Sequence, residues 1–91
     1  MKHYTEDELK TALPSWNYNN IGIEKDFGFK DFNEAFSFMT RVALFCAIDD
    51  HHPEWSNVYN KVHIRLSTHS ENAVTDKDLV LAAKIDALII K

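Results

Sequence analysis

Two stretches of alternating apolar and polar residues each predict a pair of β-strands. The first runs from Trp16 to Phe29, and Asn19-Asn20 offers a tight turn between its two strands. Alternation in the second strand places four apolar residues on one face: Ile21, Ile23, Phe27 and Phe29. The second stretch, NVYNKVHIRLST, predicts a hairpin that turns at Asn60-Lys61 and directs three residues inward: Val62, Ile64 and Leu66.

The pattern changes to a helical period between the two strand pairs and again near the end of the chain. Asp31 followed by Glu34 is a capping pattern that opens the longest helix. Apolar residues then recur at helical spacing: Phe32, Ala35, Phe36, Met39, Val42, Ala43 and Cys46. Thr75 followed by Asp78 opens the last helix, and we expect Asp78 to cap that helix rather than to contact a ligand.

A capping box from Thr5 to Glu8 predicts a short first helix that ends at Pro14. The elements therefore follow the order α-β-β-α-β-β-α. This order predicts an α+β fold in which a four-stranded antiparallel sheet carries three helices packed on one face. Residues 1–91 are expected to form a single domain. The opposite face of the sheet, with His63 among its residues, must face solvent or a partner subunit.

Composition narrows the classes of function. The 91 residues carry a net charge of -4 at pH 7, with no run of Lys and Arg, which argues against direct binding to nucleic acid or to anionic membranes. The apolar stretch VALFCAI is too short to span a bilayer, and the first ten residues lack the apolar region of a signal peptide. We therefore expect a cytoplasmic protein.

Histidines provide the candidate chemistry, because four of the five lie between Asp49 and His69. His51 and His52 follow the long helix, which Pro53 prevents from continuing, and His69 follows the last strand. Loops at helix and strand ends commonly carry function. His63 alternates with inward-facing residues and should point away from the core. No role is expected for His3, which lies in a terminus that we expect to fray.

Three kinds of chemistry are compatible with these histidines. Imidazoles titrate near neutral pH and suit general acid–base catalysis. A three-histidine metal site is the second, although adjacent side chains tend to diverge and no HExxH pair accompanies them. Nucleophilic catalysis is the third and weakest, since Cys46 is the only cysteine and lies in an apolar stretch, where a buried thiol is inert.

The residues resemble a known family, the pterin-4a-carbinolamine dehydratases. The segment HHPEWxNVYNKVxIxLSTH, Asp78 and the following LAAKID match the most recognisable part of that family. Upstream, FxFKDFNEAFSFMTRVAL is similar to its long helix, and Trp16 stands where the family has an early tryptophan. The similarity covers nearly the whole chain in one register.

The resemblance implies the fold predicted above, as well as homodimers or tetramers. It implies that His51, His52 and His69 form the catalytic site and that His63 lies outside it. The implied reaction is the loss of water from a 4a-hydroxytetrahydropterin, without a metal or an organic cofactor. On this basis His51 and His69 share the acid and base roles, and His52 mainly positions the substrate.

The pterin ring is expected near the strand end at Ser67, Thr68 and His69, where backbone groups could pair with its pyrimidine edge. Trp16 is a candidate wall of the substrate pocket, with a place in the core as the alternative. Trp55 has the same two interpretations.

The chain departs from the family pattern at two positions. Ala47 replaces an acidic residue that often stands four positions before the histidine pair, so its task could fall to Asp49 or Asp50. Ala73 replaces a common glycine, and Asn72, which tolerates the left-handed region, could take over that turn.

Two biological roles follow from the resemblance. The first is recycling of a pterin cofactor for an aromatic amino-acid hydroxylase. The second is a non-catalytic interaction module, because some family members act as dimerisation cofactors of a homeodomain transcription factor through a helical surface. The two roles use different surfaces and do not exclude each other.

Overall fold

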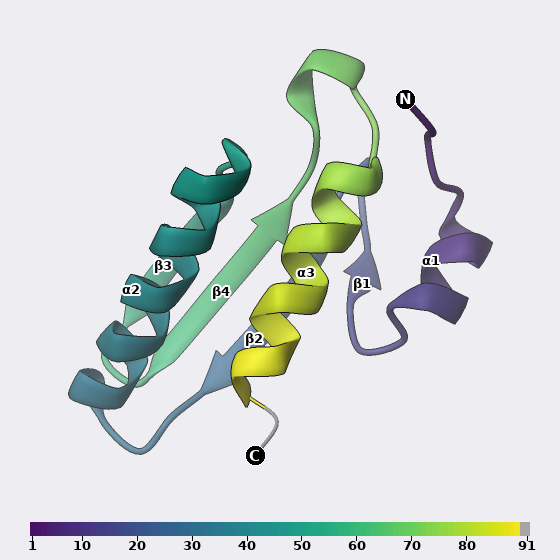
Figure 1. Cartoon of the computed structure of the whole chain (residues 1–91). Helices are drawn as coiled ribbons and strands as arrows, with labels where there is room; N and C mark the ends of the chain where they lie inside the picture. Colours follow the sequence, from purple (N-terminus) through teal and green to yellow (C-terminus); the bar gives the residue numbers. More distant parts are fainter. Residues whose placement is uncertain (90–91) are drawn as a thin grey trace.

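An antiparallel sheet forms one layer of the molecule and helices cover one of its faces (Figure 1). The computed structural model describes residues 1–89. The strands are β1 (Asn17–Tyr18), β2 (Ile23–Gly28), β3 (Glu54–Val58) and β4 (Lys61–Leu66). Their order in the sheet is β1-β2-β4-β3, so the second hairpin joins the first through the antiparallel pair β2 and β4.

The helices confirm the predicted order of elements. They are α1 (Glu6–Ala12), α2 (Phe32–Asp49) and α3 (Asp76–Ile89), and a 3-10 turn, η1 (His69–Glu71), follows β4. Figure 1 shows α2 and α3 side by side in front of the sheet, whereas α1 lies beside β1. The α+β architecture predicted from the sequence is therefore confirmed. No helix within residues 1–89 is long and apolar enough to cross a membrane.

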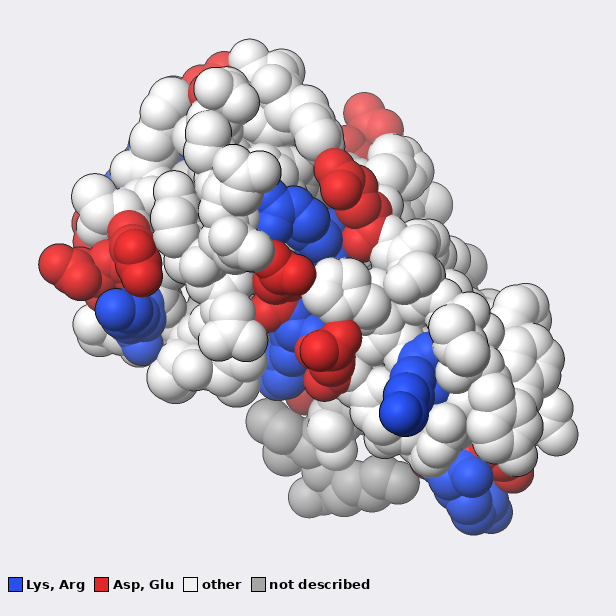
Figure 2. Space-filling model, turned by 180° about the vertical axis from the view of Figure 1, so that it is seen from behind, with Lys and Arg blue, Asp and Glu red and all other residues white. Residues whose placement is uncertain are grey.

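Strand alternation separates a core face from an open face. Ile23 and Phe27 of β2 lie buried under the helices, together with three residues of β4: Val62, Ile64 and Leu66. The alternate residues of the two strands point the other way, among them Glu24, Asp26, His63 and Arg65, which contact one another. Figure 2 shows acidic and basic side chains interspersed on the face seen from behind. Charges of both signs on a single-layer sheet are typical of a solvated face.

The first hairpin turns one residue later than the sequence predicts. Asn20 and Ile21 both have positive φ, at 52° and 62°, and Asn19 and Gly22 exchange backbone hydrogen bonds across them. This is the conformation of a two-residue hairpin turn with both central residues left-handed. Ile21 is consequently 37% exposed and does not join the core face of β2, contrary to the predicted alternation.

The buried face of α2 also differs in part from the prediction. Ala35, Val42 and Cys46 are buried as expected, but Phe38 joins them in the core while Phe36 is 56% exposed. The cause is that apolar residues occupy more than one side of α2, so the sequence pattern is compatible with two overlapping choices of the buried face. Phe38 is selected because its ring stacks against those of Phe27 and Phe29, both at 4.9 Å between centroids.

Candidate functional site

A buried hydrogen-bonded pair of side chains joins the end of α2 to the start of α3. The helix ends at Asp50, which adopts a left-handed conformation, and the backbone N–H of His51 bonds back to the carbonyl of Cys46. This reversal turns His51 inward, so that only 8% of it remains exposed. Its Nε2 lies 2.5 Å from Oδ1 of Asp78, a residue with no exposed surface.

The second oxygen of Asp78 is fully occupied. Its Oδ2 accepts hydrogen bonds from the Thr68 hydroxyl at 2.8 Å and from the Thr75 backbone N–H at 2.9 Å. The hydroxyls of Thr68 and Thr75 lie 2.7 Å apart. Asp78 therefore caps α3, as predicted. Its other oxygen, Oδ1, holds His51 in place, a second role that the sequence did not reveal.

This network assigns the atoms of the pair. A carboxylate only accepts hydrogen bonds, and the start of α3 favours its negative charge. Nε2 of His51 must then carry the proton that it donates to Asp78. In the neutral imidazole the other ring nitrogen, Nδ1, is then the acceptor, which is the arrangement that a general base requires.

A second contact brings His69 to the same edge of the sheet. His69 opens η1, and its Nε2 lies 3.2 Å from Oε1 of Glu54, the first residue of β3. Glu54 follows His51, His52 and Pro53 directly. The segment 51–54 and the segment 67–78 are therefore joined twice, once by a buried pair and once by an exposed one.

His52 lies in the same segment and is open to solvent. Its Nε2 is 3.9 Å from Oδ1 of Asp50, and its side chain is 70% exposed. One buried and two exposed imidazoles thus stand on neighbouring segments at one end of the sheet.

The remaining two histidines lie elsewhere. His63 points onto the open face of the sheet, as predicted, where its two ring nitrogens contact Asp26 at 2.6 Å and Glu24 at 3.1 Å. His3, for which we expected a frayed terminus, is instead ordered. It forms a β-bridge with Thr75, and its Nε2 lies 2.9 Å from Oε1 of Glu71.

The candidate substrate-binding residues are not all brought together. Trp16 is 5% exposed, and its indole N–H donates to Asp86. Asp86 lies eight residues beyond Asp78, about 12 Å along α3. The structure thus places Trp16 in the core. Ser67 and Thr68 do lie beside the histidines: Ser67 donates its hydroxyl to the carbonyl of Ile21, and Thr68 holds Asp78.

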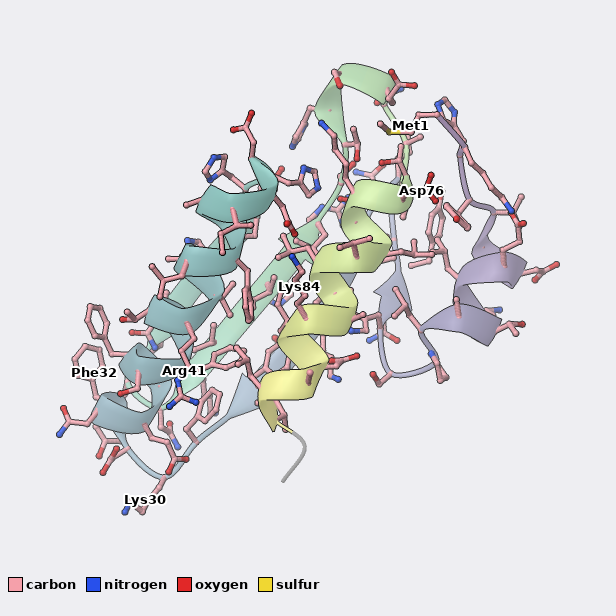
Figure 3. All side chains as sticks on the ribbon, in the orientation of Figure 1. Met1, Lys30, Phe32, Arg41, Asp76 and Lys84 are labelled. Atoms are coloured by element: carbon pink, nitrogen blue, oxygen red, sulfur yellow. The ribbon has the colours of Figure 1, made fainter. Side chains whose placement is uncertain are left out.

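The two departures from the family pattern are accommodated differently. Asp49 is engaged between the helices, with Lys84 2.7 Å from its Oδ1, and Figure 3 shows Lys84 reaching toward α2. Asp50 is the acidic residue that stands beside His52. In the loop after β4, Asn72 takes the left-handed conformation with φ at 51°, as predicted, and Ala73 does not need it.

Other chemistries find less support in the geometry. Burial raises the pKa of the Cys46 thiol above its ordinary value, and the nearby charge of Asp49 raises it further, so this thiol is a poor nucleophile. Within residues 1–89 there is no group of three His, Cys, Asp or Glu side chains placed to hold a metal ion.

Two hollows flank the histidine segments. One, of about 240 Å³, is lined by Glu54, Trp55, Ser56, His63 and Arg65 on the open face of the sheet. The other, of about 250 Å³, is lined by Asp49, Asp76, Lys77 and Val80 between α2 and α3. Both are smaller than most small-molecule pockets.

The sequence offered a signal for the buried carboxylate of Asp78. This residue shares one helical face with Leu81, Ala82 and Ile85, all of them buried, so its carboxylate needed a partner in the core.

Known proteins are similar to this chain over nearly its whole length. The family model for pterin 4 alpha carbinolamine dehydratase matches residues 2–88. A relative from Paraburkholderia xenovorans, provisionally named a pterin-4-alpha-carbinolamine dehydratase, is 61% identical over 89 residues and covers 92% of this chain and 93% of its own. One from Synechococcus sp., with the same provisional name, is 49% identical over 82 residues, covering 90% and 88%.

Two solved structures share the fold. The crystal structure of a transcriptional coactivator/pterin dehydratase from Brucella melitensis superposes with a TM-score of 0.89 at 43% identity, covering 96% of this chain and 98% of its own. A pterin dehydratase-like protein described as a RuBisCO assembly factor in the alpha-carboxysome has a TM-score of 0.69 at 20% identity, covering 96% and 95%, and supports the fold alone. The match of the family model to nearly the whole chain and the identity of its relatives establish that this protein belongs to the pterin 4 alpha carbinolamine dehydratase family.

Proposed function

We propose that this protein dehydrates a 4a-hydroxytetrahydropterin to the quinonoid dihydropterin. The reaction removes the proton from N5, forms the N5–C4a double bond and breaks the bond between C4a and its hydroxyl oxygen. A proton delivered to that oxygen releases it as water. The step needs one base and one acid, and imidazoles can serve as both at neutral pH without a metal or an organic cofactor.

The observation that carries this proposal is the buried pair of His51 and Asp78. Asp78 fixes the tautomer and orientation of His51, which frees Nδ1 to exchange a proton with substrate. His69, exposed and joined to Glu54, is the second acid–base group, and His52 positions the substrate. Each acid–base group is expected to accelerate the reaction by about 10²–10⁴-fold.

We propose that Ser67, rather than Thr68, recognises the pterin ring. The backbone N–H and C=O of Thr68 are both bonded to Ala73, and its hydroxyl serves Asp78. Thr68 is therefore a support for His51, and the task of pairing with the pyrimidine edge falls to the backbone of Ser67. Trp16 contributes by stabilising the core beneath this edge of the sheet.

Turnover of freshly generated 4a-hydroxytetrahydropterin, followed by its ultraviolet change in metal-free buffer, tests the proposal. Wild type should accelerate dehydration, and His69→Ala should lower kcat by about 10²-fold or more. His63→Ala is the matched control, because it removes an imidazole from the same strand region but on the open face, and kcat should be unchanged. No acceleration above buffer by folded wild type would refute the proposed activity, and turnover that requires added zinc would refute the metal-free mechanism.

A second function, as an interaction module, is favoured by a surface of α2. Four large apolar side chains of this helix are exposed: Phe32, Phe36, Leu44 and Ile48. They recur at multiples of four residues, so they form an apolar stripe that winds around the exposed side of α2, and Figure 3 shows Phe32 pointing away from α3. Exposed large apolar side chains that gather along one helix are typical of a protein-binding surface. We propose that it mediates assembly into dimers or tetramers, or binding to a partner helix, and that the protein recycles pterin for an aromatic amino-acid hydroxylase in the cytoplasm.

A further inference from the structure

The residues before α1 form an isolated β-bridge to the end of the loop that carries His69. His3 pairs with Thr75 in an antiparallel bridge, and the backbone N–H of Tyr4 donates to the carbonyl of Val74 at 2.9 Å. The side chains of both residues add a contact each. His3 reaches Glu71 at 2.9 Å, and the hydroxyl of Tyr4 donates to Oδ1 of Asp76 at 2.5 Å. We call residues 2–4 the N-terminal strap.

The strap is itself anchored at its other end. Tyr4 packs against the hydrophobic core, and Lys2 stacks its ammonium group 4.6 Å from the centre of the Tyr4 ring. Lys2 also pairs with Glu8, and Thr5, which follows the strap directly, caps α1. The hydrogen bond to Asp76 raises the pKa of the Tyr4 phenol, so this contact holds at neutral pH. Figure 3 labels Asp76, the acceptor of this hydrogen bond, at the start of α3.

The segment under the strap contains much of the proposed site. A bridge between Thr68 and Ala73 closes the base of the loop, and His69 opens η1 within it. Beyond the loop, Thr75 and Asp78 complete the network that holds His51. The strap contacts this segment at four positions: Glu71, Val74, Thr75 and Asp76. The residues of η1 are exposed. Besides the bridge at the base of the loop, η1 is held by the contact between His69 and Glu54 and, on the side of the strap, by the contact between His3 and Glu71.

We propose that Tyr4 is a positioning residue for the dehydration reaction, acting through Asp76 and Val74 on the placement of His69 and Asp78. This inference rests on the proposed dehydratase function. Without the strap, the loop would sample more conformations, and the imidazole of His69 would spend less time in reach of substrate. Displacement of a catalytic group by about 1 Å can cost as much as 10²-fold in rate, and loosening should cost less.

The test compares Tyr4→Phe, Asp76→Ala and Asp76→Asn. Tyr4→Phe keeps the packed ring and removes only the hydroxyl, and we expect kcat to fall roughly 3- to 10-fold with KM changed less than about 2-fold. Asp76→Ala should match it, and the double variant should be no slower than either single one, because both remove the same contact. Asp76→Asn keeps an oxygen acceptor for Tyr4 and should restore most of the activity.

Tyr59→Phe is the control for loss of a phenol hydroxyl, because Tyr59 is exposed in the turn between β3 and β4, at the opposite end of β4 from His69. All assays are run well below the melting temperature, so that kcat refers to folded molecules. A purely structural role would lower the melting temperature of Tyr4→Phe and leave kcat unchanged, and that result would overturn the proposal. Additive losses in the double variant would overturn it as well.

Amide hydrogen exchange distinguishes failure of this inference from failure of the proposed function. If wild type does not dehydrate the pterin, the dehydratase proposal and the kinetic role of Tyr4 both fall, and exchange still judges the strap. Faster exchange in residues 69–76 of Tyr4→Phe, but not of Tyr59→Phe, would support the strap as a restraint on the loop. Unchanged exchange in an active enzyme would overturn the positioning role alone.

Discussion

Nε2 of His51 lies 2.5 Å from Oδ1 of Asp78, and this contact joins two buried side chains that are 27 residues apart in the chain. Because the other oxygen of Asp78 is held by Thr68 and Thr75, the carboxylate cannot turn away from His51. The pair therefore links the end of α2 to the start of α3, and in the neutral imidazole it leaves Nδ1 as the nitrogen that we propose exchanges a proton with substrate.

Replacement of Asp78 by Asn should damage both stability and activity. An amide has one accepting and one donating end, whereas this site presents donors on both sides, so one buried donor loses its partner. We expect a loss of about 2–4 kcal/mol in the free energy of unfolding, measured by urea denaturation, and a fall in kcat of at least about tenfold. Asp86→Asn on the same helix is the control, since Asp86 is partly exposed and serves Trp16 and Lys25. A normal kcat in Asp78→Asn would contradict the assigned tautomer.

The two adjacent histidines should respond differently to substitution. His51→Gln removes a proposed proton-transfer group and should lower kcat by about 10²-fold or more. His52→Gln removes an exposed side chain from the rim of the site and should mainly raise KM. Steady-state kinetics over a range of pterin concentrations separates the two effects. An equal fall of kcat in both variants would mean that His52 takes part in proton transfer.

Ile21 in the first hairpin turn should limit stability. A β-branched residue at φ of 62° is sterically disfavoured, whereas glycine adopts this conformation freely. We expect Ile21→Gly to be more stable than Ile21→Ala by about 1 kcal/mol, because alanine keeps the Cβ atom that causes the strain. The urea midpoints of the two variants measure the difference. The hydroxyl of Ser67 donates its hydrogen bond to the backbone carbonyl of Ile21, so this hydrogen bond is preserved in both variants.

The thiol of Cys46 should make stability fall at alkaline pH. In the folded state the pKa of this thiol lies above the ordinary value of 9.0, mainly because of burial. The unfolded state therefore loses the thiol proton at a lower pH than the folded state does. The stabilising contribution is complete below pH 9 and is lost as pH rises above it. Urea midpoints of wild type should therefore drop faster between pH 8 and pH 10 than those of Cys46→Ala. The same variant should keep its kcat at neutral pH, since no step uses the thiol; a large loss would reopen nucleophilic catalysis.

The apolar stripe of α2 should control oligomeric state. The side chains of Leu44 and Ile48 are 61% and 75% exposed. A charged side chain introduced into the stripe would have to lose its hydration in any interface formed there. We expect Leu44→Glu to shift the protein to a smaller species in sedimentation velocity. Thr11→Glu on exposed α1 adds the same charge away from the stripe and should leave the distribution unchanged. Equal distributions for all three proteins would show that the stripe is not a self-association surface.

Most of the secondary structure could be predicted from the sequence because the interactions that specify it are local. The capping box of Thr5 and Glu8 and the cap of Asp31 each join residues three positions apart. Strand alternation along β4 requires only the two-residue period of an extended chain. The gathering of His51, His52 and His69 at one end of the sheet followed from the resemblance to a family, and the spacing of the histidines alone left a metal site open.

Tertiary packing decided the features that depend on contacts between distant segments. The stripe of α2 that faces the sheet was chosen by the fit of Phe38 between Phe27 and Phe29, which no helical period distinguishes from Phe36. The partners of Asp78 and Tyr4 lie 27 and 72 residues away, so local spacing does not identify either partner. Sequence by itself therefore determined the elements and the residues capable of acid–base chemistry. Only the packing of α2 and α3 on one sheet decided which imidazole is buried against a carboxylate, because burial is a property of the assembled layers.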